Sequence, residues 1–214
     1  MTPEEIKSKT IEYVQGVHAG DTTGHDWPHI MRVLGVARHL ADGEDVDDLV
    51  IQLAALLHDV ADKKLVEDTD LAKIQIVAHL SQFDTLTPEQ ADHILSIIDT
   101  IGWSSEGDVQ TLEGRIVQDA DRLDAIGAIG VARCFAYGGS KGVPIYDPMD
   151  LAKEIGNYSS KEAARRSSIA HFYDKLTLLE GKMNTLKAKA IARRRTAFLE
   201  AYLDQFFQEW NVIL

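Results

Sequence analysis

Two polar residues, His58 and Asp59, follow the most apolar stretch of the 214-residue sequence. The run from Ile51 to Leu57 is almost entirely aliphatic, which predicts a helix that is buried on most faces. An imidazole and a carboxylate at the end of such a helix are costly to bury unless something pairs with them. A metal ion offsets both costs, because it binds a neutral imidazole nitrogen and a carboxylate oxygen together. We therefore predict that His58 and Asp59 form half of a metal site.

Two separate stretches offer the remaining ligands. His29 lies in a predicted helix upstream, and Asp121 lies in the acidic segment 118–127. Two imidazoles and two carboxylates suit Mn²⁺, Fe²⁺, Co²⁺, Ni²⁺ or Zn²⁺ better than Mg²⁺, although Mg²⁺ also accepts such ligands. A divalent ion of this kind orients a phosphate and lowers the pKa of a bound water toward ~7. The expected cofactor is one divalent transition metal.

Three residues near these ligands are candidates for handling a phosphorylated substrate. Asp62 follows His58 by about one helical turn, so it could activate the attacking water as a general base if the helix continues that far. His25 and Arg32 flank His29 and could hold phosphate oxygens, a task that suits the guanidinium fork of arginine. The predicted chemistry is therefore metal-assisted hydrolysis of a phosphate ester or anhydride.

Each of these features also has a purely structural interpretation. A buried His–Asp pair can be an ordinary hydrogen-bonded couple, because most buried polar groups are simply satisfied. Asp121 and Asp124, on either side of Arg122, can be a solvated helix face, and His29 can be a core or surface histidine. The combination favours a metal site, because three separated helices would each present polar groups among apolar residues.

The elements that carry these residues are all predicted to be helices, and no alternating strand pattern is present. The fold class is therefore all-α, with a single domain of roughly eight helices. Residues 137–160 are the longest irregular stretch, of a length typical of a lid or a binding loop. The apolar periodicity and the capping signals predict helices over residues 3–18, 26–41, 70–81, 87–101, 109–136, 161–180 and 184–211, and a central helix that starts at Asp47-Asp48 and breaks after Asp62.

The amino-acid composition limits the kinds of partner that the protein is expected to bind. The sequence has 22 Lys and Arg against 34 Asp and Glu, a net charge of −12, which disfavours binding to nucleic acid or to an anionic membrane. An anionic substrate would need a local focus of positive charge. The one cysteine, Cys134, excludes an intramolecular disulfide and suits a reducing cytosol. With no signal-peptide core and no apolar run of ~20 residues, a cytoplasmic protein is expected.

Three motifs resemble the signatures of the HD-domain metal-dependent phosphohydrolases. The resemblance spans about residues 20–210 and extends to a bacterial subgroup of stand-alone HD proteins that includes nucleotide pyrophosphohydrolases. Segments 58–63, 119–130, 136–139 and 171–176 carry the match to that subgroup. The signatures are Gly24-His25-Asp26-Trp27-Pro28-His29-Ile30-Met31-Arg32-Val33, Leu56-Leu57-His58-Asp59-Val60 and Ala120-Asp121-Arg122-Leu123.

The resemblance implies roles for individual residues. Asp62 matches the acidic position that handles the attacking water in some members, and Lys63 beside it is a candidate substrate contact. His171 and Lys175 would contact substrate phosphates, although a packed histidine and a solvated lysine are the structural alternative. Asp124 would either orient a ligand or cap neighbouring backbone. The four residues that match the family's metal ligands are His29, His58, Asp59 and Asp121.

The resemblance also implies an HD-domain helical fold over residues 1–214. Its motif-bearing core would span about 20–136, with the C-terminal helices 161–211 packed on it. The expected activity is hydrolysis of nucleoside or deoxynucleoside triphosphates to the monophosphate and pyrophosphate. A phosphomonoesterase or a cyclic-nucleotide phosphodiesterase is the alternative within the superfamily, and a non-catalytic nucleotide-binding regulatory module is the alternative from another class. The apolar stripe of the last helix could pack internally or across a homodimer.

Overall fold

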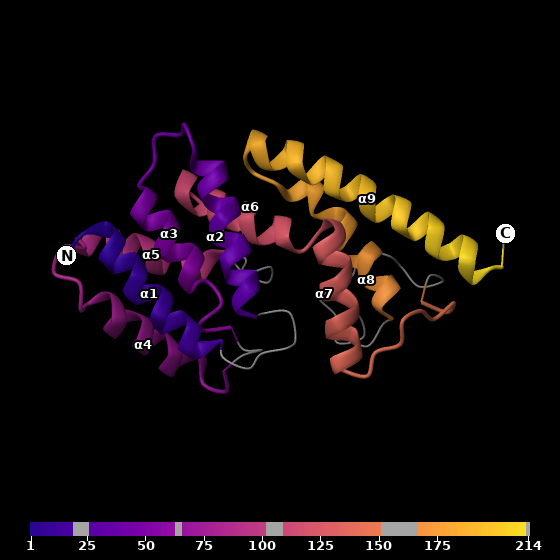
Figure 1. Ribbon diagram of the computed structural model, residues 1–214, viewed down its shortest axis with the longest axis horizontal. Helices are drawn as coiled ribbons and strands as arrows, with labels where there is room; N and C mark the ends of the chain where they lie inside the picture. The colour runs from indigo at the N-terminus through magenta and orange to yellow at the C-terminus, as the bar shows by residue number, and fades with distance from the viewer. Residues whose placement is uncertain (19–25, 63–65, 102–108, 151–166, 213–214) are drawn as a thin grey trace. The chain divides into compact units, whose positions relative to one another are not determined.

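The computed structural model describes residues 1–18, 26–62, 66–101, 109–150 and 167–212. Within these ranges the chain is all-α and contains no strand, as predicted (Figure 1). None of the described helices has the length and apolar character needed to cross a bilayer. The helices are α1 (Pro3–Val17), α2 (Trp27–Ala41), α3 (Asp48–Leu57), α4 (Thr69–Leu80), α5 (Pro88–Thr100), α6 (Leu112–Asp124), α7 (Gly127–Ser140), α8 (Ser168–Asp174), η2 (Leu176–Leu178), η3 (Glu180–Lys182) and α9 (Leu186–Trp210).

The chain divides into two compact units, Met1–Asp121 and Arg122–Leu214. The first contains α1 to α5 and most of α6, and the second contains the end of α6 and all later helices. The single-domain organisation expected from the sequence stays a prediction. Each unit is described by itself below.

The apolar helix α3 is the centre of the first unit. All residues from Leu53 to Leu57 are buried, and α1, α2 and α5 pack around the helix. Its start is fixed by Asp47, whose Oδ1 accepts the backbone N–H groups of Leu49 and Val50 at 3.0 and 3.1 Å. Burial on every side explains why α3 is apolar all round, and it makes the end of α3 a rigid place to carry functional groups.

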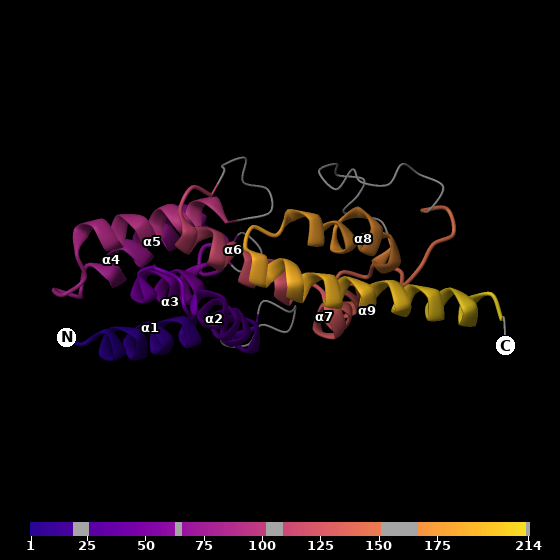
Figure 2. The same ribbon diagram turned by 90° about the horizontal axis from the view of Figure 1, so that it is seen from above.

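Helices α1 and α4, whose ribbons are drawn in Figure 2, are joined through one buried histidine, His79 of α4. The His79 ring stacks on Tyr13 with 4.4 Å between ring centroids, and its Nε2 lies 3.0 Å from the Thr10 hydroxyl oxygen. Thr10 donates its own proton to the Ile6 carbonyl at 3.0 Å, so its oxygen accepts the Nε2–H of His79. His79 therefore joins two helices through a ring contact and a hydrogen bond.

Aromatic side chains build the core of the second unit between α7, α8 and α9. Phe172 stacks on Tyr202 with 5.7 Å between centroids, and Phe135 lies 6.0 Å from each of them. Phe172 is fully buried. Helix α9 packs one face internally, but the apolar stripe seen in the sequence does not coincide with that face, because Phe198 and Trp210 of the stripe are exposed. The buried residues of α9 are Ala188, Ala192, Thr196, Leu199 and Leu203.

The prediction of a continuous helix over 109–136 is wrong. Helix α6 ends at Asp124, and α7 begins at Gly127 with a φ of +79°, a left-handed value that glycine adopts readily. A Cβ atom at Gly127 would lie 3.0 Å from Cγ of Arg195, so the glycine also permits close approach of α9. The helix break redirects the chain just after Asp121.

The predicted helix over 161–180 is also shorter in the structure. Helix α8 covers only Ser168–Asp174, and the 3-10 helices η2 and η3 follow it. The predicted irregular stretch 137–160 begins inside a helix, because α7 continues to Ser140, and its last ten residues, 151–160, lie outside the described residues.

Candidate metal centre

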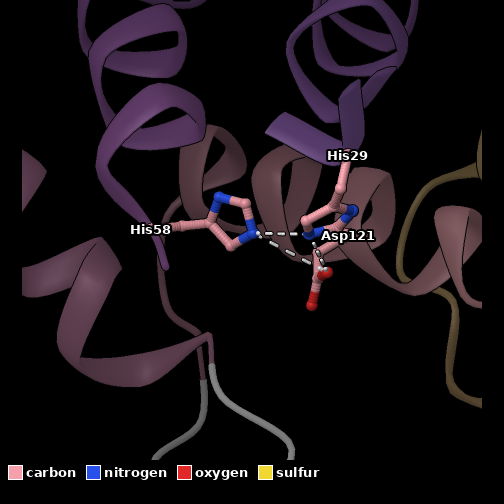
Figure 3. Close-up of side chains that lie close together, drawn as sticks. All are labelled: His29, His58 and Asp121. Atoms are coloured by element: carbon pink, nitrogen blue, oxygen red, sulfur yellow. Dashed lines mark hydrogen bonds and ion pairs between the residues drawn. The ribbon is translucent and has the colours of Figure 1, made fainter. Parts of the chain in front are cut away.

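Three side chains from distant parts of the first unit point toward one another (Figure 3). His29 comes from α2, His58 from the residue after α3, and Asp121 from α6. One ligand atom from each lies within 4.8 Å of the other two. The two Nε2 atoms are 3.3 Å apart, and Oδ1 of Asp121 lies 3.7 Å from Nε2 of His29 and 3.8 Å from Nε2 of His58. These three residues could hold a metal ion.

Asp59 borders the same cluster through both carboxylate oxygens. Its Oδ2 lies 3.2 Å from Nε2 of His29, and its Oδ1 lies 3.5 Å from Nε2 of His58. Asp59 is buried, like both histidines. The four candidate ligands predicted from the sequence therefore lie together, although Asp59 contacts the two histidines through different oxygens.

The orientation of His58 is fixed by its own turn. Its Nδ1 lies 2.8 Å from the Ala55 carbonyl oxygen, and because a carbonyl only accepts, Nδ1 is the protonated nitrogen. In the neutral ring, Nε2 then carries a lone pair aimed at the cluster, which is the form that binds a metal. The role of the Ala55 carbonyl was not predicted, although its spacing of three residues before His58 is the sequence signal that places it there.

His29 is positioned by the start of α2. Asp26 caps this helix as predicted, and its Oδ1 accepts the backbone N–H of His29 at 3.0 Å. Pro28 in the first turn stiffens the backbone further. The His29 side chain is fully buried, so bulk water does not reach its imidazole and cannot take its place as a ligand.

The cluster fits a divalent cation in spacing and in charge. With metal–ligand bonds of about 2.1 Å, neighbouring ligands around one ion lie roughly 3.0–3.4 Å apart, close to the observed 3.2–3.8 Å. Two neutral imidazoles and two carboxylates carry a charge of about −2 that is costly to bury without a cation. The Asp121 side chain is 36% exposed, so a substrate can approach the cluster from that side.

Asp62 does not lie on the helix that carries the cluster. Helix α3 ends at Leu57, and turns follow in which the N–H of Val60 donates to Leu57 and that of Asp62 donates to Asp59, at 3.1 and 3.0 Å. The helical continuation on which the geometric argument depended is therefore wrong. Asp62 is partly exposed and close to the ligands in the chain, so its role as a base stays a prediction.

Only some of the predicted substrate contacts lie within the described residues. His25 and Lys63 lie outside the described residues. Arg32 lies on α2, one turn after His29.

The remaining predicted residues lie in the second unit. Asp124 is buried, and its Oδ2 accepts a hydrogen bond from Nη1 of Arg133 at 2.7 Å. His171 lies on α8, while Lys175 is the residue after its last turn, so the two do not share one continuous helix as predicted. Whether they contact a phosphate stays a prediction.

The HD domain family matches residues 27–126 of this chain, the region that contains all four candidate ligands. Among curated proteins, the chain is 34% identical over 197 residues to the uncharacterized protein YpgQ of Bacillus subtilis, covering 90% of this chain and 88% of that protein.

Solved structures of similar proteins share the fold over nearly their whole length. A protein from Lactobacillus plantarum gives a TM-score of 0.84 at 38% identity, covering 98% of both chains. An HD-superfamily hydrolase from Bacillus thuringiensis gives 0.76 at 40% identity, covering 98% of this chain and 99% of the other. A crystal structure of YpgQ in complex with ADP gives 0.76 at 34% identity, covering 95% and 97%.

Proposed function

The chain belongs to the HD domain family, and from that premise we propose that it is a metal-dependent phosphohydrolase of nucleotides. The specific reaction we propose is hydrolysis of a nucleoside or deoxynucleoside triphosphate to the monophosphate and pyrophosphate. The observation that carries the proposal is the convergence of His29, His58 and Asp121, with the His58 lone pair held toward the cluster by Ala55. The hydrolase class is supported by the similar Bacillus thuringiensis protein.

The metal would be held by His29, His58, Asp59 and Asp121. When bound, it would supply Lewis-acid stabilisation of the phosphate charge and would acidify a coordinated water. The donor set of two nitrogens and two carboxylates favours Mn²⁺ or another transition ion over Mg²⁺. Protein groups that are fixed before the substrate arrives need no reorganisation during the reaction. The buried candidate ligands on α2 and after α3 are groups of this kind.

A nucleotide is the proposed substrate class for two reasons. The solved structure of the relative YpgQ contains ADP, which shows that a protein of this fold binds a nucleotide. A polyanion can also approach a chain of net charge −12 only where positive charge is concentrated, which the metal and nearby basic side chains would provide. The proposed phosphate contacts are His25, Arg32, Lys63, His171 and Lys175.

The proposed chemical step needs a base near the ligands. Asp62 would accept a proton from the water that attacks the α-phosphorus, the bond from that phosphorus to the β-bridging oxygen would break, and pyrophosphate would leave. His58 would not act as the base, because its Nδ1 proton is engaged with the Ala55 carbonyl and its Nε2 faces the other ligands.

Product analysis tests this function directly. The protein is loaded with Mn²⁺, each nucleoside and deoxynucleoside triphosphate is added, and the products are separated by chromatography. Monophosphate and pyrophosphate in equal amounts are expected from the wild-type protein. His58→Ala should abolish the reaction, while His39→Ala, which changes an exposed histidine of α2, should leave it intact.

Other outcomes would redirect the assignment. Diphosphate with phosphate, or free nucleoside, would retain hydrolase chemistry but indicate cleavage of a different bond. Turnover of cyclic nucleotides alone would indicate a phosphodiesterase. Nucleotide binding without turnover under every metal condition would contradict the enzyme and indicate a regulatory module.

A further inference from the structure

A polar cluster of Asp47, Gln90 and Glu113 joins the N-terminal ends of three helices at the end of α3 opposite the candidate ligands. Asp47 caps α3, Gln90 lies in the first turn of α5, and Glu113 lies in the first turn of α6. His58 follows Asp47 by eleven residues, and Asp121 follows Glu113 by eight. At a rise of about 1.5 Å per residue, the cluster lies roughly 16 Å and 12 Å from these two ligands along their helices.

Two bonds of the cluster each link two helices. The backbone N–H of Asp47 donates to Oε1 of Glu113 at 3.1 Å, which ties the start of α3 to the start of α6. The Asp47 Oδ2 accepts from Nε2 of Gln90 at 2.7 Å, which ties α3 to α5. The amide oxygen of Gln90 accepts the backbone N–H of Thr87 at 3.1 Å, so the amide is held at both ends.

Glu113 is not needed to cap its own helix. The Thr111 hydroxyl already accepts the N–H of Gly114 at 3.2 Å, the bond expected of an N-cap residue. The Glu113 side chain is only 16% exposed, and its other oxygen lies 4.0 Å from Nε2 of His93 on α5. Its carboxylate is thus partly buried and bonded to a neighbouring helix, which a residue serving only helix formation or solubility would not require.

We propose that Glu113 is a positioning residue for the metal centre. By accepting the Asp47 amide, it fixes the axial position of α6 relative to α3, and thereby the distance between the Asp121 carboxylate and the His58 imidazole. Functional constellations tolerate displacements of only about 0.5 Å, and a helix transmits an axial shift along its length. The inference rests on the proposed function, because it assumes that these residues bind a metal.

The test is the affinity for Mn²⁺, measured by calorimetry without nucleotide at a temperature well below unfolding. We expect Glu113→Ala to weaken Mn²⁺ binding about tenfold, the lower range of effects caused by groups that orient metal ligands. Glu113→Gln keeps an oxygen acceptor and should bind within about twofold of wild type. The matched control is Asp68→Ala, which removes an N-cap bond to Leu71 in α4, a helix that carries no candidate ligand.

Equal Mn²⁺ affinity of Glu113→Ala and wild type would overturn the positioning role, as would an equal loss in Asp68→Ala. A wild-type protein that binds no transition metal would overturn the proposed function and this inference together, so the two failures are distinguishable. If Glu113→Ala does not fold, Glu113→Asp replaces it. Its shorter side chain should weaken binding while Glu113→Gln does not, and the opposite order would contradict the proposal.

Discussion

At the scale of single residues, the candidate centre depends on where protons and lone pairs lie. The Ala55 carbonyl holds the proton of His58 on Nδ1, at 2.8 Å, and leaves Nε2 to face His29 and the carboxylates. Asp26 holds the first turn of α2, from which the buried His29 projects. Hydrogen bonds to the backbone, which a binding motif alone does not reveal, therefore orient the two histidines.

The prediction at the scale of single residues concerns Asp62. Asp62→Asn should lower kcat by about 10²–10⁴-fold, because the amide cannot accept the proton of the attacking water. Nucleotide affinity should change little, since the amide retains the size of the carboxyl group. Steady-state kinetics and equilibrium nucleotide binding measure the two effects separately.

Asp68→Asn is the control for that experiment. It makes the same chemical change at the N-cap of α4, where asparagine caps about as well as aspartate, so turnover should be retained. Unchanged turnover in Asp62→Asn would remove Asp62 from the mechanism.

At the scale of elements, the first unit consists of helices held around α3, and the second is organised by the bend between α6 and α7. In the first unit, His79 joins α4 to α1 through Thr10 and Tyr13. In the second unit, Gly127 starts α7 with a left-handed φ, and the Arg195 side chain lies against it and donates to the Leu123 carbonyl. The contacts of His79 and those of Gly127 each lead to a separate prediction about stability.

Burial lowers the pKa of His79 below its ordinary value of 6.5. The unfolded chain therefore binds a proton at a pH where the folded protein does not, so stability is fully present above about pH 6.5 and is lost as the pH falls. The loss is at most about 1.4 kcal/mol per pH unit. Urea unfolding at pH 7.5 and 5.5, with chelator present, should show that His79→Gln loses less stability than wild type between the two values.

The exposed His39 provides the comparison for that experiment. His39→Gln should retain the wild-type loss of stability between pH 7.5 and 5.5. If His79→Gln and wild type lose the same amount, protonation of His79 is not coupled to unfolding.

Gly127→Ala should destabilise the protein by about 1–2 kcal/mol or more, because alanine resists a φ of +79° and its Cβ would lie 3.0 Å from Arg195. Gly139→Ala in the same helix is the matched control. A Cβ there meets no atom within 4 Å, and alanine is the better helix former, so this change should be neutral or stabilising. Denaturant unfolding of both variants measures the difference, and equal effects would contradict the role of the left-handed turn.

At the scale of the whole molecule, a metal should act as part of the folding free energy. All four candidate ligands lie in the first unit but are spread from residue 29 to residue 121, so the unfolded chain has no formed site. A metal at one hundred times its Kd should stabilise the native state by about 2.7 kcal/mol. For a chain of this size, that corresponds to a rise in Tm of roughly 5–11 °C.

Calorimetric melting with and without Mn²⁺ measures this linkage. His58→Ala should show almost no rise in Tm, His39→Ala should show the full rise, and chelator should reverse it. A rise of equal size in His58→Ala would mean that the ion binds elsewhere. The net charge of −12 makes weak binding to other surface acids a real competitor, so the variant comparison is essential.

The sequence by itself determined the helical class, most helix limits, the central place of α3 and which candidate ligands lie together. These follow from local causes: the apolar run before His58, the caps Asp26 and Thr87, and motifs whose residue types suit one metal. The break at Gly127 was not predicted, because a glycine within a helical pattern does not reveal the sign of its φ.

Only the tertiary structure decided how the ligands are oriented and supported. The end of α3 at Leu57, the proton on Nδ1 of His58, and the bond from Asp47 to Glu113 each depend on groups that meet in space. Asp47 and Glu113 are 66 residues apart, and the periodicity of neither helix contains information about that contact. Spacing along the chain identified which residues can bind a metal, whereas packing between helices sets the distances at which they can do so.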